Sequence, residues 1–449
     1  MAFAQEDQDA FMIKSIHEQT LENGGCYQWL DHLSENIGGR LAGSENSEKA
    51  IEYTKGILEG ISDTVYLQEC QVPFWVRGGN EVARITGLPG GATHNLKATA
   101  LGNSIATSTD GLEAEVIEVN GLDHVRELGI EAISGKIVFY NRPMNPSLVN
   151  TFHAYGAAAD QRVNGPAVAA EYGAVGVVVR SLTTKLDFVP HTGVTVYKEG
   201  IPKIPAIAIS TNDADFLSKF LRVQPLKIFM KTKCKLLSES KLSHNVVAEI
   251  KGSEFPDEII LVGGHLDSWD LGGGAHDDGA GCVHSIQVFE TLKAIGYQPK
   301  RTLRCVMFMN EENGLGGGRA YAEASNENGE FHLAAIESDA GGFTPHGFSC
   351  DATDEVFTDL FRKLTEWSPM LETYNLSLSK GGSGADINPL KSQNGILCGL
   401  RPDSQRYFDY HHTKDDRIDA VNERELKLGA AAMTSLVYLI DQYGLKDSQ

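Results

Sequence analysis

The sequence predicts an α/β fold in which a mixed, mostly parallel sheet is flanked by helices and is interrupted by a β-rich insertion. From residue 245 onward, short apolar runs alternate with segments of helical spacing, a pattern typical of a sheet covered on both faces. Residues 79–237 instead contain many short β-type runs separated by turn residues. A chain of 449 residues exceeds one ordinary domain. We therefore predict that segments 1–78 and 238–449 form one domain, into which 79–237 is inserted.

Composition narrows the classes of partner. The formal net charge of −21 would repel nucleic-acid phosphates, so we expect no nucleic-acid partner. Hydrophobic residues make up 41% of the chain and charged residues 22%, values near those of soluble globular proteins. No apolar run reaches the roughly 18 residues that a membrane-spanning helix needs. We therefore expect no membrane partner.

The cysteines and the amino terminus bear on the compartment. Seven cysteines are scattered without any Cys-x-x-Cys spacing, which disfavours a thiolate metal site or a dense disulfide framework and predicts mostly buried thiols. Ala2-Phe-Ala4 is similar to the end of a signal peptide, although no charged region or apolar core precedes it. A secreted or periplasmic location is one interpretation. A chance match, compatible with a cytoplasmic protein, stays open.

The first segment is expected to be helical from Asp9 to Ile61, with a glycine-rich break at Gly38–Ser44, and to continue into a strand at 64–76. Ser44 is placed to cap the second helix. The break lacks both Gly-x-Gly-x-x-Gly and a Walker lysine, so it is interpreted as a turn and not as a phosphate loop.

The insertion is expected to hold five strands and two helices. His153 and His191 fall in its loops, where exposed or lid positions are favoured over metal ligation. The expected strands are 114–119, 135–140, 173–179, 204–209 and 226–230, and the expected helices are 155–172 and 212–222.

Acidic residues and histidines follow several strands of the last segment. His265 and Asp267 follow the apolar run 259–262, and Asp277 and Asp278 precede a helix. Alone, these residues are as compatible with a helix N-cap turn and a structural histidine as they are with a metal site.

Further strands repeat the arrangement. Glu311 and Glu312 follow 303–309, Asp339 follows 333–338, and a later loop carries His411 and His412. Because the carboxyl ends of parallel strands share one edge of a sheet, these side chains should converge. Crowding of carboxylates without a cation is costly, so the convergence favours a metal site. A loop with Asp386, the strand 395–400 and a closing helix at 421–442 complete the segment.

As a set, these motifs resemble the zinc exopeptidases of the aminopeptidase Y and glutamate carboxypeptidase superfamily. The matched pieces are Gly263-Gly-His265-Leu-Asp267-Ser-Trp269, Gly274-Ala-His276-Asp277-Asp278-Gly279, Asn310-Glu311-Glu312-Asn-Gly314, Glu337-Ser-Asp339-Ala-Gly341 and Tyr410-His411-His412-Thr-Lys-Asp415. The resemblance extends to the Gly39–Ser44 region and implies that 79–237 is a protease-associated (PA) domain. It therefore spans nearly the whole chain and implies a zinc exopeptidase domain split by that insertion.

The resemblance implies two zinc ions per chain. His265 and Asp339 would hold one zinc, Glu312 and His412 the other, and Asp277 would bridge both. Two zinc ions carry four positive charges, which three ligand carboxylates and one shared hydroxide balance while both histidines stay neutral.

The resemblance also implies the catalytic groups. Glu311 would be the general base, and Asp267 would be the acceptor that orients the His265 imidazole. The peptide bond between Asp277 and Asp278 is expected to be cis, as is common in the family. His412 is favoured over His411 as the ligand because the family ligand directly precedes Ser or Thr.

Roles in substrate binding stay open. His411 could line the pocket or pack, and Tyr407 or Tyr410 could donate a hydrogen bond to the tetrahedral intermediate. Asp386 could pair with a substrate ammonium group. Whether His276 perturbs the metals is a further open point.

The leading functional hypothesis is a zinc exopeptidase that hydrolyses dipeptides or short unblocked peptides, as in the glutamate carboxypeptidase branch. An aminopeptidase acting on longer peptides is the alternative within the enzyme class. Outside that class, a non-catalytic receptor-like binding protein is the alternative, and a single-zinc glutaminyl cyclase is a further enzyme with a similar architecture. The complete ligand set disfavours the receptor, and the insertion with its Asp-bridged pattern disfavours the cyclase. The resemblance also implies a homodimer.

Overall fold

The chain forms two compact units in the computed structural model, which describes residues 2–445. The first unit comprises Met1–Val72, Lys241–Tyr407 and Asp415–Gln449, and the second comprises Pro73–Ser240 and Phe408–Lys414. The short segment Phe408–Lys414, which the sequence pattern placed with 238–449, thus belongs by its contacts to the second unit.

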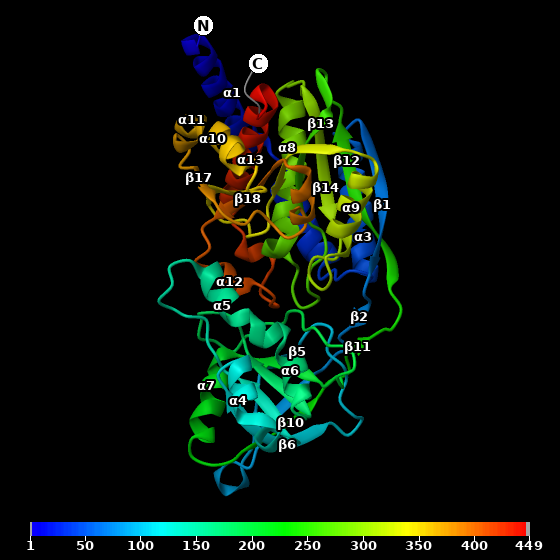
Figure 1. The fold of residues 1–449 in the computed structure, drawn as a ribbon, viewed down its shortest axis with the longest axis vertical. Helices are drawn as coiled ribbons and strands as arrows, with labels where there is room; N and C mark the ends of the chain where they lie inside the picture. Colours follow the sequence, from blue (N-terminus) through cyan, green and yellow to red (C-terminus); the bar gives the residue numbers. More distant parts are fainter. Residues whose placement is uncertain (1, 446–449) are drawn as a thin grey trace. The chain divides into compact units, whose positions relative to one another are not determined.

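The first unit is built on an eight-stranded mixed sheet (Figure 1). In spatial order its strands are β1 (Thr64–Val72), β12 (Lys241–Ile250), β14 (Arg301–Phe308), β13 (Phe255–His265), β15 (Phe331–Glu337), β18 (Ile396–Pro402), β16 (Pro345–Asp351) and β17 (Ser377–Lys380). The central pairs β14–β13, β13–β15 and β15–β18 are parallel, as is β16–β17, and the remaining pairs are antiparallel. Since β14, β13 and β15 are parallel neighbours, their carboxyl ends meet at one edge.

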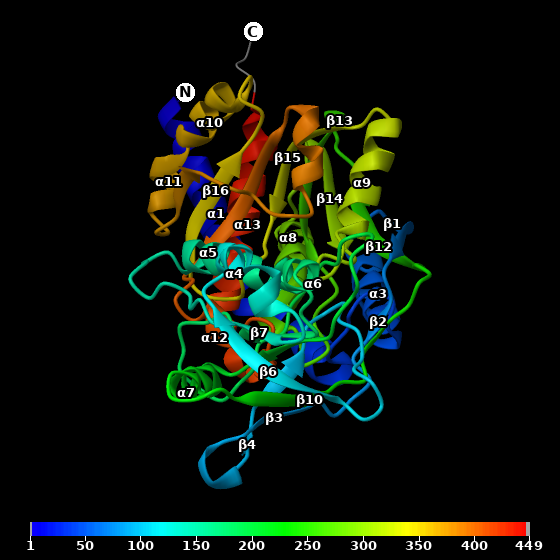
Figure 2. The same ribbon diagram turned by 60° about the horizontal axis from the view of Figure 1, so that its bottom comes forward.

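Helices cover both faces of this sheet, which confirms the mixed α/β architecture (Figure 2). The larger apolar core holds residues from helices α1 (Ala2–Asn23), α2 (Cys26–Asp31), α3 (Glu45–Glu59), α8 (Ala280–Ala294), α10 (Phe357–Thr365), α11 (Ser368–Glu372) and α13 (Glu423–Tyr443). A smaller core on the other face involves α9 (Gly316–Glu327). As expected, the Ser44 side chain caps α3 by accepting a hydrogen bond from the Ser47 N–H.

The second unit carries its own eight-stranded sheet. In spatial order its strands are β4 (His94–Asn95), β3 (Val82–Thr86), β10 (Lys227–Lys231), β6 (Leu112–Val119), β7 (Ile137–Tyr140), β8 (Gly176–Arg180), β9 (Ala206–Ile209) and β5 (Ala98–Ala100). A separate pair joins β2 (Trp75–Val76) to β11 (Lys235–Leu236). All five strands expected from the sequence are present within a few residues of their expected bounds.

The helices of the second unit differ more from expectation. Helix α7 (Thr211–Leu221) was expected, but the single helix expected at 155–172 is two helices, α5 (Thr151–Val163) and α6 (Gly165–Glu171). Pro166 has no N–H and is tolerated in a first helical turn, so a new helix begins there. Helix α4 (Leu122–Ile133) was missed, because Gly129, at φ +70°, interrupts its helical pattern.

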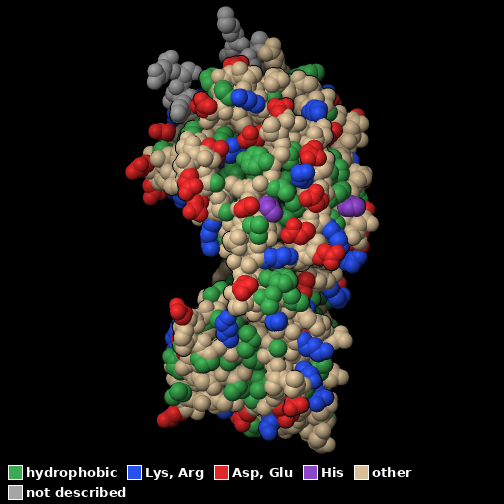
Figure 3. Space-filling view, turned by 90° about the vertical axis from the view of Figure 1, so that its right-hand side faces the viewer, with side chains coloured by type: hydrophobic (Ala, Val, Ile, Leu, Met, Phe, Trp, Pro, Cys, Tyr) green, Lys and Arg blue, Asp and Glu red, His purple; other side chains and the backbone are tan. Residues whose placement is uncertain are grey.

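The cysteines and the surface agree with the composition. All seven cysteines are buried and free, as expected of scattered thiols. On the face shown in Figure 3, acidic and basic side chains are interspersed, so neither charge forms a continuous field there. Among the described residues, no helix has both the length and the apolar character that crossing a membrane requires.

One buried histidine gives the fold a predicted pH dependence. His332 is 1% exposed, its Nε2 lies 2.7 Å from the Tyr321 hydroxyl and its Nδ1 lies 2.9 Å from Gln393 Oε1. Burial lowers the pKa of His332 to about 4, against about 6.5 in an unfolded chain. The unfolded chain therefore takes up the proton first as the pH falls, so the stability from a neutral His332 is present above pH 6.5 and is lost below it.

We expect His332→Gln to flatten this dependence. The loss of unfolding free energy between pH 7.5 and pH 5 should shrink by roughly 2 kcal/mol in the variant. Urea unfolding at the two pH values measures it. The exposed His153→Gln is the matched control, and an equal pH dependence in His332→Gln and the parent protein would contradict the prediction.

Candidate metal centre

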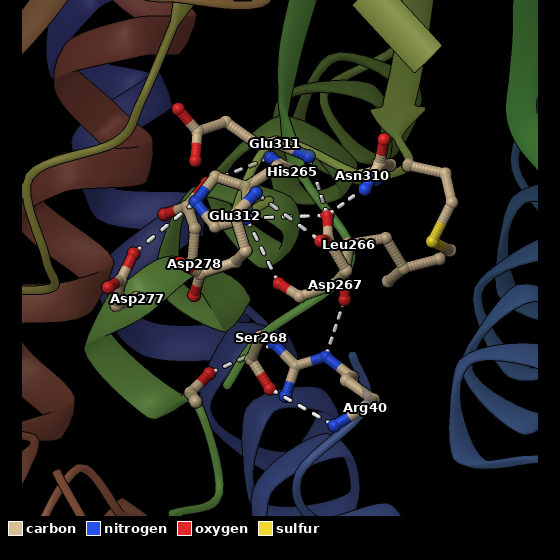
Figure 4. A network of polar contacts seen from close by, with 12 residues as sticks. Arg40, His265, Leu266, Asp267, Ser268, Asp277, Asp278, Asn310, Glu311 and Glu312 are labelled. Atoms are coloured by element: carbon tan, nitrogen blue, oxygen red, sulfur yellow. Dashed lines mark hydrogen bonds and ion pairs between the residues drawn. The ribbon is translucent and has the colours of Figure 1, made fainter. Parts of the chain in front are cut away.

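The candidate centre begins at the carboxyl end of β13. His265 is the last residue of the strand and is 1% exposed. Its Nε2 lies 3.3 Å from Asp277 Oδ1 and 3.5 Å from Asp339 Oδ1 (Figure 4 shows the His265 and Asp277 side chains). Candidate ligand atoms of these three residues all lie within 4.8 Å of one another. The structure thus brings together one imidazole and two carboxylates from separate parts of the chain.

A glycine lets the strand and the next helix approach each other. A Cβ at Gly264 would lie 2.5 Å from Asp278 Oδ2 and 2.8 Å from the Gly281 carbonyl carbon. The Asp278 carboxylate in turn accepts hydrogen bonds from the backbone N–H groups of His265 and Gly281, at 3.1 and 3.0 Å. Asp278 therefore ties the strand end to the start of α8, and its neighbour Asp277 faces His265. The peptide bond between the two aspartates is cis, as the resemblance implied.

The electrostatics of the cluster favour bound positive charge. Burial lowers the pKa of His265, but the Asp277 and Asp339 carboxylates outweigh it and hold that pKa well above its ordinary value. Burial together with neighbouring carboxylates also raises the pKa of Asp278. An imidazole and carboxylates are suitable donors for zinc and for related divalent metals. The residues present therefore fit a metal ion.

The Asp267 carboxylate contacts the loop after β14, which carries Glu311 and Glu312, more closely than it contacts the His265 ring. The His265 Nδ1 lies 3.0 Å from the backbone carbonyl oxygen of Asp267 and 3.8 Å from its carboxylate. The carboxylate instead accepts hydrogen bonds from three successive N–H groups, those of Asn310, Glu311 and Glu312, at 2.7, 3.0 and 3.4 Å (Figure 4). The expected contact is corrected accordingly: the carbonyl accepts from the imidazole, and the carboxylate holds the loop that carries the two glutamates.

We expect Asp267→Asn to lower kcat/KM by roughly 10- to 100-fold, because an amide cannot accept from three N–H groups without presenting its own N–H to one of them. Steady-state kinetics measure the loss. Asp270→Asn is the control, because Asp270 is exposed and lies in the same loop as Asp267. Unchanged kcat/KM in Asp267→Asn would contradict the role given to Asp267.

Glu311 and Glu312 follow β14 and differ in burial. Glu312 is 5% exposed and its Oε1 accepts a hydrogen bond from the Trp269 N–H at 3.2 Å, whereas Glu311 is half-buried. Burial raises the pKa of Glu311 well above its ordinary value; His265 opposes this, and Asp339 and Glu312 add to it. A carboxyl with a raised pKa is a better proton acceptor than an ordinary glutamate.

His411 and His412 belong to the second unit. Their rings are stacked at 3.5 Å between centroids, and the His411 ring also packs edge-on against Tyr155 and Phe408. The His412 Nδ1 lies 3.3 Å from the Thr192 carbonyl oxygen, and the Thr192 N–H donates to the His412 carbonyl at 3.0 Å. The Arg162 guanidinium, which can only donate, lies 3.4 Å from the same nitrogen, so Thr192 favours a proton on Nδ1 and Arg162 opposes it. The tautomer with the proton on Nδ1 is the one that leaves Nε2 with the lone pair that a metal ligand needs.

Other residues singled out from the sequence have distinct surroundings. Tyr410 is half-buried in α12 (Tyr407–Tyr410). His276 stacks on Phe343 at 4.2 Å, its Nε2 donates to the Ala420 carbonyl and its Nδ1 accepts from the Gly342 N–H, so both ring nitrogens are engaged. Asp386 is wholly buried and neither carboxylate oxygen has a hydrogen-bond partner among the described residues. Its carboxylate is therefore not accessible to a substrate in this conformation.

Sequence reasoning assigned no role to two buried carboxylates, Glu337 and Asp416. Glu337, on β15, accepts from the N–H groups of Ala385 and Ile387, and burial raises its pKa to about 8. The sequence feature that could have indicated Glu337 is a carboxylate at the end of a largely apolar strand. Asp416 accepts from the N–H groups of His276 and Asp277. It follows directly after the matched motif that ends at Asp415.

Comparison with known proteins identifies the family. The model of peptidase family M28 matches residues 245–437. Carboxypeptidase Q from Bos taurus is 34% identical over 417 residues, which cover 92% of this chain and 84% of that protein. The chain belongs to peptidase family M28. The match to carboxypeptidase Q agrees with the superfamily that the motifs indicated.

Solved structures of peptidase family M28 and related proteins agree with this assignment. A peptidase M28 precursor from Shewanella amazonensis is 31% identical and superposes with a TM-score of 0.90, covering 99% of this chain and 98% of that one. BSAP, a zinc aminopeptidase from Bacillus subtilis, superposes with a TM-score of 0.66 over 93% of this chain and 95% of its own; at 20% identity it supports the fold alone. The expected enzyme class is confirmed: this family member is a metallo-exopeptidase, and peptides are its class of substrate.

Proposed function

We propose that the protein is a zinc-dependent exopeptidase that hydrolyses dipeptides or short unblocked peptides, in the manner of a carboxypeptidase Q-like enzyme. The observation that supports this most directly is the cluster of His265, Asp277 and Asp339 at the carboxyl end of β13, beside Glu311. A buried imidazole between two carboxylates is a suitable cation site, and a glutamate of raised pKa beside it is a suitable general base.

The proposed ligand set holds two zinc ions. His265 and Asp339 would bind one ion, Glu312 and His412 the other, and Asp277 would bridge them. When bound, the zinc ions supply Lewis acidity that polarises the scissile carbonyl and makes water more acidic. The stacked His411 ring and the Thr192 carbonyl support the orientation of the His412 ring.

Glu311 acts as the general base in this proposal. Its carboxylate accepts a proton from the attacking water and then delivers it to the nitrogen of the leaving amine. Asp267 keeps Glu311 in place by accepting the N–H groups of residues 310–312. Tyr410 and His411 are proposed to contact substrate, and Asp386 to balance a substrate ammonium group.

The second unit is proposed to be a PA domain inserted in the catalytic domain, with boundaries near 79 and 237. We propose a homodimer, in a secreted or periplasmic location. Light scattering that shows only monomer at assay concentration would contradict the dimer.

Hydrolysis of a dipeptide panel tests the function. Free dipeptides, the same dipeptides blocked at either end, and longer peptides are incubated with zinc-loaded protein. Cleavage of free dipeptides, lost when the amino end is blocked, is the expected result. Faster cleavage of long peptides from the amino end would favour the aminopeptidase alternative. No hydrolysis of any substrate by protein that contains zinc would contradict the proposal.

A further inference from the structure

A buried arginine contacts the loop between His265 and Asp277. Arg40, in the glycine-rich break before α3, is 0% exposed. Its guanidinium donates three hydrogen bonds to backbone carbonyls of this loop. Nε donates to Leu266 at 2.6 Å (Figure 4), Nη1 to Gly273 at 2.7 Å and Nη2 to Gly274 at 3.0 Å. The Arg40 side chain therefore contacts the loop near both of its ends, at Leu266 and at Gly273–Gly274.

Asp416 holds the same loop from the other end of the chain. Its Oδ1 accepts from the His276 N–H at 2.7 Å and its Oδ2 from the Asp277 N–H at 3.1 Å, while its backbone carbonyl accepts from the Gly273 N–H at 2.8 Å. The Gly273 N–H thus donates to the Asp416 carbonyl, and the Gly273 carbonyl accepts from the Arg40 guanidinium. The Arg40 side chain thus engages the backbone just before the segment η3 (Ala275–Gly279), and the Asp416 side chain engages it inside the segment, at His276 and Asp277.

The local glycines show that this packing is tight. A Cβ at Gly274, whose φ is +56°, would lie 2.3 Å from the Ser268 Cβ and 2.8 Å from Arg40 Nη1. A Cβ at Gly279 would lie 2.7 Å from the Gly274 carbonyl oxygen, which accepts from both Arg40 Nη2 and the Gly279 N–H. The loop has little room to adopt a second shape while Arg40 stays in place.

The Arg40 guanidinium and the Asp416 carboxylate are chemically suited to holding the backbone of the loop 266–277. A guanidinium has a planar fork that can serve three carbonyls at once, whereas a lysine ammonium at the end of a flexible stem cannot. A carboxylate can accept two adjacent N–H groups, whereas an asparagine amide would present its own N–H to one of them. Leaving a buried N–H or carbonyl unsatisfied is unfavourable, so either change should let the loop shift.

We infer that Arg40 and Asp416 are positioning residues that hold the loop 266–277 in the shape that sets Asp277 against His265 and Asp339 before a metal ion binds. The inference rests on the proposed zinc function. It assigns a purpose to the Gly39–Ser44 region, which the sequence alone indicated only as a turn between helices.

Measurement of zinc affinity tests the inference independently of catalytic activity. The full chain is freed of metal and titrated with zinc in competition with a chromogenic chelator. The titration gives the affinity of the tightest zinc site, which is compared among variants. Arg40→Lys, Arg40→Met and Asp416→Asn are each expected to weaken it roughly 10- to 100-fold. Cobalt-loaded Arg40→Lys should also show a changed visible absorption spectrum, because the ligand geometry changes.

Arg304→Lys is the matched control. Arg304 is also buried in the first unit, at 5% exposed, but among the described residues its guanidinium contacts Glu249, Glu330 and Tyr321 and not the loop 266–277. The zinc affinity of the Arg304→Lys variant should stay within about threefold of that of the parent protein. Equal loss in Arg304→Lys would show general destabilisation and would overturn the inference.

The lysine variant separates geometry from charge. Parent-like zinc affinity in Arg40→Lys together with weakened affinity in Arg40→Met would mean that positive charge alone matters, and would overturn the positioning role. Should Arg40→Met fail to fold, Arg40→Lys and Asp416→Asn still decide the result. Failure of the parent protein to bind zinc would refute the proposed function itself, which is a distinguishable outcome.

Discussion

Glu311→Gln is expected to lower turnover by roughly 100- to 10,000-fold while zinc content stays unchanged. Glutamine is close to glutamate in shape, but it cannot accept a proton from water and return it to the leaving amine. Glu311 is placed for that exchange because its backbone is held by Asp267 and its carboxyl has a raised pKa beside the His265 cluster. Steady-state kinetics on the best dipeptide of the panel, with zinc measured by atomic absorption, give the result.

Glu372→Gln provides the matched control for this variant. Glu372 lies exposed on α11 of the same unit, so the same change of charge there should leave kcat within experimental error. Turnover in Glu311→Gln within tenfold of the parent protein would rule out a general-base role for Glu311. Loss of zinc from that variant would show instead that the residue acts on the metal centre.

Removal of metal by a chelator is expected to abolish hydrolysis and to destabilise the first unit. His265, Asp277 and Asp339 lie within ion-pair distance in a buried site, and the carboxylates lose their compensating cation when the metal leaves. A ligand that binds only the folded chain stabilises it by about 3 to 4 kcal/mol at 100 to 1,000 times its Kd. Thermal unfolding with and without zinc should therefore show a higher Tm with zinc.

Two controls accompany the chelation experiment. Re-addition of zinc should restore activity and Tm, and magnesium, which prefers oxygen ligands in octahedral geometry, should not. Asp277→Asn should show little zinc-dependent change in Tm. A chelated protein that retains full activity, or an Asp277→Asn variant that zinc stabilises as strongly as the parent, would contradict the proposed centre.

Several features of the fold were predictable because they depend on local pattern. The short apolar runs before His265, before Glu311 and before Asp339 are fully buried strands in a largely parallel part of the sheet. Their alternation with helices predicted that their carboxyl ends would share an edge, and His265 does meet Asp339 there. The interruption of helix α4 by Gly129 and the division of a predicted helix at Pro166 were harder, because one residue changes the periodic pattern.

The sequence by itself determined the α/β class, the strand ends that carry the acidic residues and histidines, and the family to which the chain belongs. Only the tertiary structure decided how those residues are held. The Asp267 carboxylate accepts hydrogen bonds from three N–H groups of the loop after β14, whereas Arg40 and Asp416, more than 370 residues apart in the chain, hold the loop 266–277 that follows β13. The physical reason is that strand and helix periodicity reflects contacts between near neighbours, whereas a buried hydrogen-bonding group takes whichever partner the folded chain brings to it.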